Sequence, residues 1–89
     1  IAQALIRAPQ IATRIREIVL MGGGFFEGGN ITPTAEFNIY VDPQAAHIVL
    51  TSGVPIVMLP LDVTHKALTS ARRIERFRAM GTRSGAASA

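Results

Sequence analysis

Two short, continuous apolar runs constrain the fold of this chain more than any other feature. The first covers residues 18–21 (Ile-Val-Leu-Met) and ends at three glycines. The second covers residues 55–61 (Pro-Ile-Val-Met-Leu-Pro-Leu). Its Pro60 is expected near the end of a strand, because proline cannot donate a hydrogen bond to a sheet. Continuous rather than alternating apolarity is typical of parallel strands covered on both faces. We therefore predict two buried, parallel strands.

The stretch between the two runs carries the signals of a helix. Asp42 is a suitable N-cap and Pro43 a suitable first helical residue, while Gly53 is expected to stop the helix. Its inward face would be formed by Ala45, Ala46, Val49 and Leu50. Strand, loop, helix and strand form a βαβ crossover. The predicted class is α/β: a βαβ fragment of a mostly parallel, Rossmann-like open sheet with helices on both faces.

Helices are also predicted at both ends of the chain. Residues 1–7 are expected to be the end of a helix, and Pro9 to open a second one that stops near Arg16. A last helix follows Ser70 and ends at Gly81, with apolar residues at every third position: Ala71, Ile74, Phe77 and Met80.

Length and composition fit one small or incomplete domain. A free-standing domain of 89 residues would bury only about 60–65% of its unfolded surface and would be marginally stable. We interpret residues 1–89 as a single partial domain, with a frayed or truncated tail at 82–89 that is rich in Ser, Ala and Gly.

Composition also limits the compartment and the partners. The chain has no cysteine, which excludes disulfides and thiolate metal sites and suits the cytoplasm. No apolar run approaches the roughly 18 residues of a membrane span, and no secretory signal is visible. We expect a cytoplasmic location and no membrane partner.

Three polar side chains follow the first strand and its glycine-rich loop. Asn30, Glu36 and Asn38 lie within nine residues, where α/β proteins place binding groups. In extended backbone, Glu36 and Asn38 would point the same way and Phe37 toward the core. An ionised Glu accepts hydrogen bonds and Asn both donates and accepts, which suits the hydroxyls of a sugar. Alternatively, Asn30 is a turn residue, Glu36 a surface carboxylate and Asn38 a loop or cap residue.

The glycine-rich loop at residues 22–29 has five glycines in eight positions. It fails the Rossmann fingerprint at Glu27, the third glycine position, and lacks the Gly-Lys-Ser/Thr of a P-loop. We interpret it as a loop that lets the backbone and Asn30 approach a ligand. Phe25 and Phe26 either cover an apolar face of that ligand or pack locally.

Asp62 and His65 follow the second strand, on the side of the sheet where the glycine loop is expected. They form a candidate acid–base or metal pair. The alternative is that Asp62 and Thr64 cap the following turn. The other histidine, His47, lies in the central helix and is expected to be structural or exposed.

A basic cluster occupies the last helix and its surroundings: Lys66, Arg72, Arg73, Arg76, Arg78 and Arg83. Such a cluster could contact nucleic acid. Apolar residues at helical spacing on the other face instead indicate an ordinary amphipathic helix. We expect no nucleic-acid partner.

Four motifs in order resemble the inosine–uridine nucleoside hydrolases. That family carries Met-Gly-Gly, then Gly-Asn-x-x-Pro-x-Ala-Glu-Phe-Asn, then Asp-Pro-Glu-Ala-Ala, then Pro-Leu-Asp-Val-Thr-His. The corresponding segments here are residues 21–23, 29–38, 42–46 and 60–65. Gln44 replaces the usual Glu, and the glycine loop is slightly longer.

The resemblance implies a ribonucleoside substrate and hydrolysis of its N-glycosidic bond. It implies that Asn30, Glu36 and Asn38 hold the ribose hydroxyls and that Met21 lines the sugar pocket. The family uses a Ca²⁺-bound water, deprotonated by an Asp, as its nucleophile. Its calcium ligands come from an Asp-rich N-terminal stretch and a later Asp, and neither is present in this chain.

The chain therefore resembles the central segment of a nucleoside hydrolase, with the sugar clamp but with no catalytic residue and no metal ligand. We expect the isolated chain to be inactive. Its apolar strands exceed what a few short helices can cover, so we also expect a homo-oligomer. The alternative is a truncated, non-catalytic α/β module that self-associates or binds a partner.

Overall fold

A parallel pair of strands with helices packed against it forms the main body of the molecule. The computed structural model describes all residues from 1 to 89. Strand β1 (Ile18–Met21) pairs in parallel with strand β2 (Ile56–Leu59), with Ile18 opposite Ile56 and Met21 opposite Leu59. The predicted α/β class and both strands are confirmed, although β2 is shorter than the predicted run. Pro60 lies directly after β2, as expected.

Helix α3 (Pro43–Leu50) connects the two strands as predicted. The carboxylate of Asp42 accepts a hydrogen bond from the Ala45 N–H at 2.9 Å, so Asp42 is the N-cap and Pro43 the first helical residue. Val49 is buried, whereas Leu50 is exposed and its predicted inward position is wrong. Leu50 follows Val49 directly and so projects about 100° away from it around the helix, whereas Ile48 on the other side of Val49 packs against the core.

Helix α1 (Ala2–Arg7) confirms the helix expected at the N-terminus. The following segment is a 3₁₀ helix, η1 (Pro9–Arg14), rather than an α-helix to Arg16. Its backbone bonds span three residues, as in Ile11 N–H to Ala8 C=O. Short connecting helices often adopt this tighter geometry.

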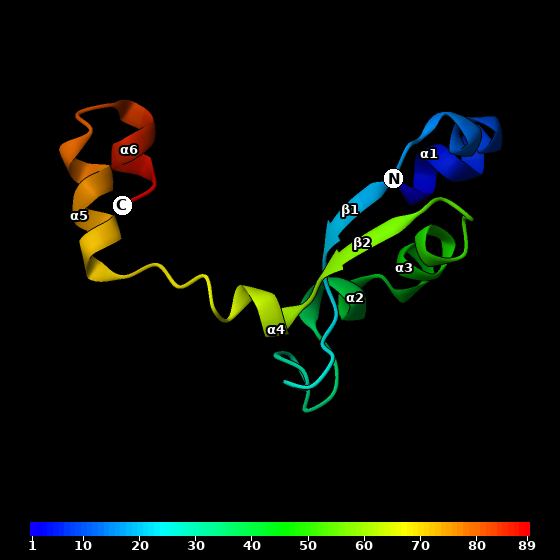
Figure 1. Cartoon of the computed structure of the whole chain (residues 1–89), viewed down its shortest axis with the longest axis horizontal. Coiled ribbons are helices and arrows are strands. Elements are labelled where there is room, and N and C mark those ends of the chain that lie inside the picture. The colour runs from blue at the N-terminus through cyan, green and yellow to red at the C-terminus, as the bar shows by residue number, and fades with distance from the viewer.

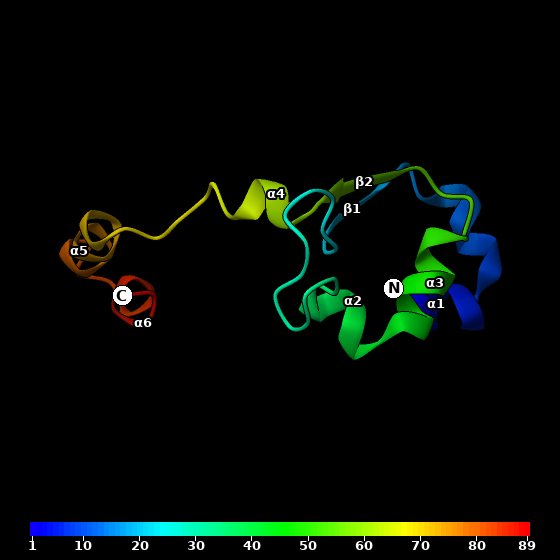
Figure 2. The ribbon, with the colours of Figure 1, turned by 90° about the horizontal axis from the view of Figure 1, so that it is seen from below.

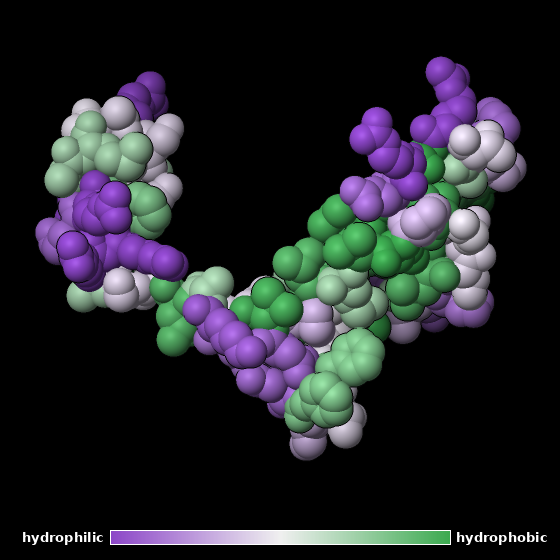
Figure 3. Space-filling view, viewed as in Figure 1, coloured by the Kyte–Doolittle hydropathy of each residue, from purple (hydrophilic) through white to green (hydrophobic).

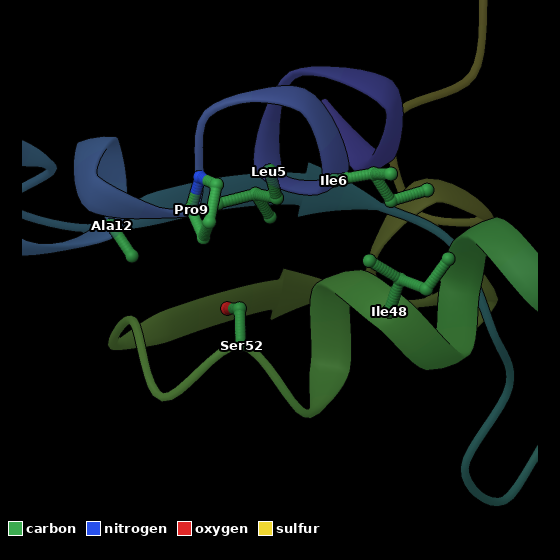
Figure 4. A pocket seen from close by; sticks show the side chains of 6 residues that line it. All are labelled: Leu5, Ile6, Pro9, Ala12, Ile48 and Ser52. Atoms are coloured by element: carbon green, nitrogen blue, oxygen red, sulfur yellow. The ribbon is translucent and has the colours of Figure 1, made fainter.

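The core is small and lies on one face of the sheet. It contains five buried residues, and α1, α3 and β1 contribute four of them: Ala2, Leu5, Val49 and Ile18, with Val54 as the fifth. Figure 2 shows the helices below the two strands and no helix above them. Between α1, η1 and α3 an apolar groove remains, drawn in Figure 4 and lined by Leu5, Ile6, Pro9, Ala12, Ile48 and Ser52.

The opposite face of the sheet is bare. We expected both faces to be covered, but Val19 is 59% and Val57 48% exposed on this side. Figure 3 views this face, and apolar residues gather over β1 and β2. Val19 and Val57 occupy paired positions, so the bare face is continuous across both strands.

The C-terminal helices stand apart from the sheet. Helix α4 (Leu61–Thr64) follows β2, and an extended segment leads to α5 (Ala71–Ala79) and α6 (Arg83–Ala87), as Figure 1 shows. The radius of gyration is 16.9 Å, against about 12 Å for a compact domain of this length. The tail at 82–89 contains α6, whose first turn is capped by Thr82. Its predicted fraying stays a prediction. No helix is both long and apolar enough to span a membrane.

We expect the isolated chain to self-associate through the bare face. Lysine at both paired positions (Val19→Lys with Val57→Lys) would have to be desolvated in such a contact and should weaken association at least about tenfold. Sedimentation measures this directly, with the double variant Gln3→Lys and Gln44→Lys, at exposed positions of α1 and α3, as the charge-matched control. A monodisperse monomer at high concentration would contradict the prediction.

Candidate functional site

Two of the predicted site residues cap the N-terminus of helix α2 (Phe37–Val41). The Asn30 Oδ1 atom accepts a hydrogen bond from the Phe37 N–H at 2.8 Å. The Glu36 carboxylate accepts bonds from the N–H groups of Asn38 (2.9 Å) and Ile39 (3.3 Å). The first N–H groups of a helix have no partner within the helix, so these side chains satisfy them.

This helix corrects the expected local geometry. We predicted extended backbone with Phe37 pointing into the core, but residues 37–41 are helical and Phe37 is 49% exposed. The segment Phe-Asn-Ile-Tyr-Val has weak intrinsic helix propensity. The side chains of Asn30 and Glu36 cap the helix, and their hydrogen bonds stabilise it despite this weak propensity.

Glu36 is the most deeply buried carboxylate of the site. The residue is 3% exposed, and its Oε2 atom also accepts a bond from the Gly23 N–H at 3.0 Å. Burial by itself raises the pKa of this carboxyl, but the N–H groups of Asn38, Gly23 and Ile39 together outweigh it and lower the pKa. Glu36 is therefore ionised at neutral pH and joins the end of β1 to the start of α2.

Acid should loosen this junction. The pKa of Glu36 is lower in the folded chain than its ordinary value of 4.5, so its stabilising contribution is complete above about pH 4.5 and is lost as the pH falls through the folded pKa. We expect the amide NMR signals of Asn38 and Ile39 to report this loss. In Glu36→Gln the transition at these amides should be absent. The same transition in both proteins would contradict the assignment.

Asn38 and Met21 meet at the C-terminal end of β1. The Asn38 Nδ2 group donates a hydrogen bond to the Met21 Sδ atom at 3.1 Å. Both residues line a hollow of about 250 Å³ whose other walls come from α1, β1, α2 and α3, among them Ile39 and Ala45. Asn30 and Glu36 do not line this hollow. They connect to it through α2, whose first turn they cap.

The glycine loop allows two stretches of backbone to run close together. A Cβ atom on Gly24 would lie 2.0 Å from the Gly28 carbonyl oxygen. One on Gly29 would lie 2.3 Å from backbone atoms of Thr32 and Ala35. Side chains at these two positions would clash with backbone, so the loop requires glycine there.

Asp62 fastens this loop to helix α4. Its carboxylate accepts hydrogen bonds from the N–H groups of Phe25 (2.8 Å), Phe26 (2.8 Å) and Glu27 (3.3 Å). Bonds from the Phe25 and Phe26 amides lower the pKa of Asp62. The prediction that it caps the following turn is therefore wrong, because the carboxylate faces a loop 35 or more residues away in sequence.

His65 bonds to a residue that the sequence did not single out. Its Nδ1 atom pairs with the Glu27 carboxylate, and both side chains are partly exposed. His65 is thus paired with Glu27, and Asp62 with the loop backbone, rather than with each other. Neither partnership could be found from spacing, since 38 residues separate Glu27 from His65. His47 is exposed, as expected.

Phe25 and Phe26 lie at the exposed end of the loop. Their ring centroids are 5.9 Å apart, and the residues are 73% and 95% exposed. They contact each other and do not enter the core. The two rings thus pack locally against each other, which was one of the two interpretations, and their covering of a ligand stays a prediction.

The comparisons with known proteins decide the family. The sequence profile described as inosine-uridine preferring nucleoside hydrolase matches residues 1–89. The chain belongs to this nucleoside hydrolase family. The resemblance drawn from the four motifs is confirmed.

Relatives of the nucleoside hydrolase segment come from a yeast and from bacteria. The pyrimidine-specific ribonucleoside hydrolase RihA of Salmonella enteritidis is 58% identical over 81 residues, covering 91% of this chain and 26% of RihA. An uncharacterized protein of Schizosaccharomyces pombe is 60% identical over 85 residues, covering 96% of this chain and 27% of its own. The chain thus spans about a quarter of the length of these curated relatives.

A solved structure confirms the fold. The chain is similar to the inosine-uridine preferring nucleoside hydrolase of Bacillus anthracis, with a TM-score of 0.77 and 31% identity. The match covers 89% of this chain and 28% of the other. The βαβ arrangement therefore corresponds to part of a larger α/β enzyme.

The residues of this nucleoside hydrolase segment do not fit a calcium site. Ca²⁺ takes six to eight oxygen ligands, but no group of three or more His, Cys, Asp or Glu residues is present. The two aspartates are engaged elsewhere: Asp42 caps α3 and Asp62 holds the glycine loop.

The basic cluster lies on the separate C-terminal helices. Arg73, Arg76, Phe77 and Met80 line an open hollow of about 390 Å³ on α5, far from the loop and α2 in Figure 1. Arg78 pairs with Glu75 on the same helix at 2.8 Å. The amphipathic pattern is confirmed, although Met80 at the end of its apolar face is exposed.

Proposed function

We propose that this chain is a segment of a ribonucleoside hydrolase and supplies the ribose-binding part of its site. Asn30, Glu36 and Asn38 bind the sugar hydroxyls, and Met21 lies beside the sugar. The observation that carries the proposal is the Glu36 carboxylate, which is buried, ionised and fixed by three backbone N–H groups. A carboxylate fixed in this way can accept a hydrogen bond from a ribose hydroxyl without first changing its position.

Each of the three polar residues keeps unused hydrogen-bonding capacity. A carboxylate has about four lone-pair positions. Glu36 uses two on Oε2 and one on Oε1, which leaves one on Oε1 for a ribose hydroxyl. Asn30 uses only its Oδ1 atom and Asn38 only its Nδ2 group, so one retains an amide donor and the other a carbonyl acceptor.

These residues would act most strongly on the transition state. Cleavage of an N-glycosidic bond places positive charge on the ribose ring, as in other oxocarbenium-like transition states. A fixed negative carboxylate at the hydroxyls stabilises that charge more than it stabilises the neutral substrate. The nucleophile and any Ca²⁺ ligands would come from residues outside this chain.

A chimera tests the proposal. The 81 matching residues of this chain replace the corresponding segment of Salmonella enteritidis RihA, and a reducing-sugar assay measures ribose release from uridine and from inosine. We expect ribose release from at least one nucleoside. RihA with its own segment is the control. A folded chimera with no activity on either nucleoside would contradict the proposed function.

The bare face of the sheet favours a second candidate, a non-catalytic module that self-associates or binds a partner. Its motivation is the exposure of Val19 and Val57 across both strands. The chimera distinguishes the two, because a segment that has lost its binding geometry would leave the host folded but inactive.

A further inference from the structure

One carboxylate of α4 accepts hydrogen bonds from three successive N–H groups of the glycine loop. Phe25, Phe26 and Glu27 all donate to Asp62, at 2.8, 2.8 and 3.3 Å. The loop and α4 are distant in sequence, and the Glu27–His65 pair adds a second connection between them. The loop therefore has its conformation imposed by α4 rather than by local sequence, which is rich in glycine.

The same connection continues to Glu36 through Gly23. The Gly23 carbonyl accepts a hydrogen bond from the Leu61 N–H at 3.0 Å, and its N–H donates to the Glu36 Oε2 atom at 3.0 Å. Leu61 immediately precedes Asp62 and is buried. Gly23 is thus fixed on one side by the start of α4 and on the other by the carboxylate.

The space around Gly22 and Gly23 is limited. A Cβ atom on Gly22 would lie 3.2 Å from the Ile39 side chain and 3.5 Å from the Glu36 Oε2 atom. The loop backbone therefore packs directly against the Glu36 carboxylate and the first turn of α2. Movement of the loop would move the donor that Gly23 offers.

We propose that Asp62 is a positioning residue: it fixes the glycine loop and, through Gly23, orients the Glu36 carboxylate toward ribose. The inference rests on the proposed function, in which Glu36 binds the ribose. Asp62 does not touch the substrate. Asp62 restricts the loop, which contains five glycines, to one conformation. In that conformation the Gly23 N–H points at Glu36.

Two variants of Asp62 test the arrangement. Asp62→Ala removes every acceptor, whereas Asp62→Asn keeps one carbonyl oxygen and can hold only part of the loop. Amide hydrogen exchange of the 89-residue chain should be slow at Phe25, Phe26 and Gly23. It should become at least about tenfold faster in Asp62→Ala, with Asp62→Asn between the two. The control, Glu75→Gln, removes an exposed carboxylate that bonds only to Arg78.

Kinetics in the RihA chimera separate positioning from folding. Misplacing a catalytic group by about 1 Å can cost about 100-fold in rate. We expect kcat per folded molecule to fall about 10- to 100-fold in Asp62→Ala, less in Asp62→Asn, with a smaller change in KM. A purely structural role would lower the amount of folded enzyme and leave kcat per folded molecule unchanged.

The exchange experiment and the chimera kinetics test different claims. An inactive parent chimera would contradict the proposed function, while exchange in the chain would still decide whether Asp62 fixes the loop and the Gly23 amide. Equal exchange at Phe25, Phe26 and Gly23 in the parent and in Asp62→Ala would overturn the inference. An active chimera whose kcat per folded molecule is insensitive to both variants would overturn it as well.

Discussion

Replacing Glu36 with glutamine in the RihA chimera is expected to slow nucleoside hydrolysis about 30- to 1000-fold, a loss of roughly 2–4 kcal/mol of transition-state stabilisation. Glutamine has the size of glutamate but no negative charge. Its amide group would also face N–H donors of Gly23, Asn38 or Ile39, which now point at carboxylate oxygens. The fall should appear mainly in kcat, because the charge acts on the transition state.

The Glu36 measurement needs a correction for folding. Glu36 caps α2, and loss of a cap costs about 1 kcal/mol of stability. Rates are therefore expressed per folded molecule, and Glu75→Gln on α5 serves as the control for removal of a carboxylate. Unchanged turnover in Glu36→Gln would remove Glu36 from the site.

The isolated chain is expected to release no ribose from inosine or uridine and to bind no Ca²⁺ at sub-millimolar concentration. The reason is the number of ligands: no three acidic or histidine side chains converge, and both aspartates already bond to backbone N–H groups. A sugar clamp without a positioned nucleophile does not accelerate hydrolysis. Calorimetric titration with Ca²⁺ and a reducing-sugar assay measure both quantities.

Two outcomes of that experiment are informative. Sub-millimolar calcium binding together with ribose release would show that Asp62, His65 or Glu27 does more than hold the glycine loop. Activity in the chimera together with none in the isolated chain is the expected pair of results. It would place the missing groups in the remaining three quarters of the host.

The sequence predicted the elements whose signals are local. Continuous apolarity identified both strands, and Asp42 followed by Pro43 identified the start of α3. These features depend on neighbouring residues only, so one sequence suffices to find them. The α-helix to Arg16 was wrong, because the segment forms a six-residue 3₁₀ helix that ends at Arg14.

The site was only partly predictable, because its geometry depends on distant residues. Asn30, Glu36 and Asn38 were predicted as binding residues from their chemistry and from the family motif. That Glu36 caps a helix was not predicted, because the segment was predicted to be extended, and its bond to Gly23, 13 residues away, could not be found from spacing. The role of Asp62 depends on contacts 35 to 37 residues away, which spacing does not reveal.

A crystal structure of the RihA chimera with ribose bound would test the proposed ribose-binding role most directly. If that role is correct, ribose hydroxyl oxygens lie within hydrogen-bond distance of the Glu36 Oε1 atom and of the Asn30 and Asn38 amide groups, with Met21 against the sugar. Ribose bound elsewhere, with Glu36 still contacting only the backbone N–H groups of Gly23, Asn38 and Ile39, would contradict it.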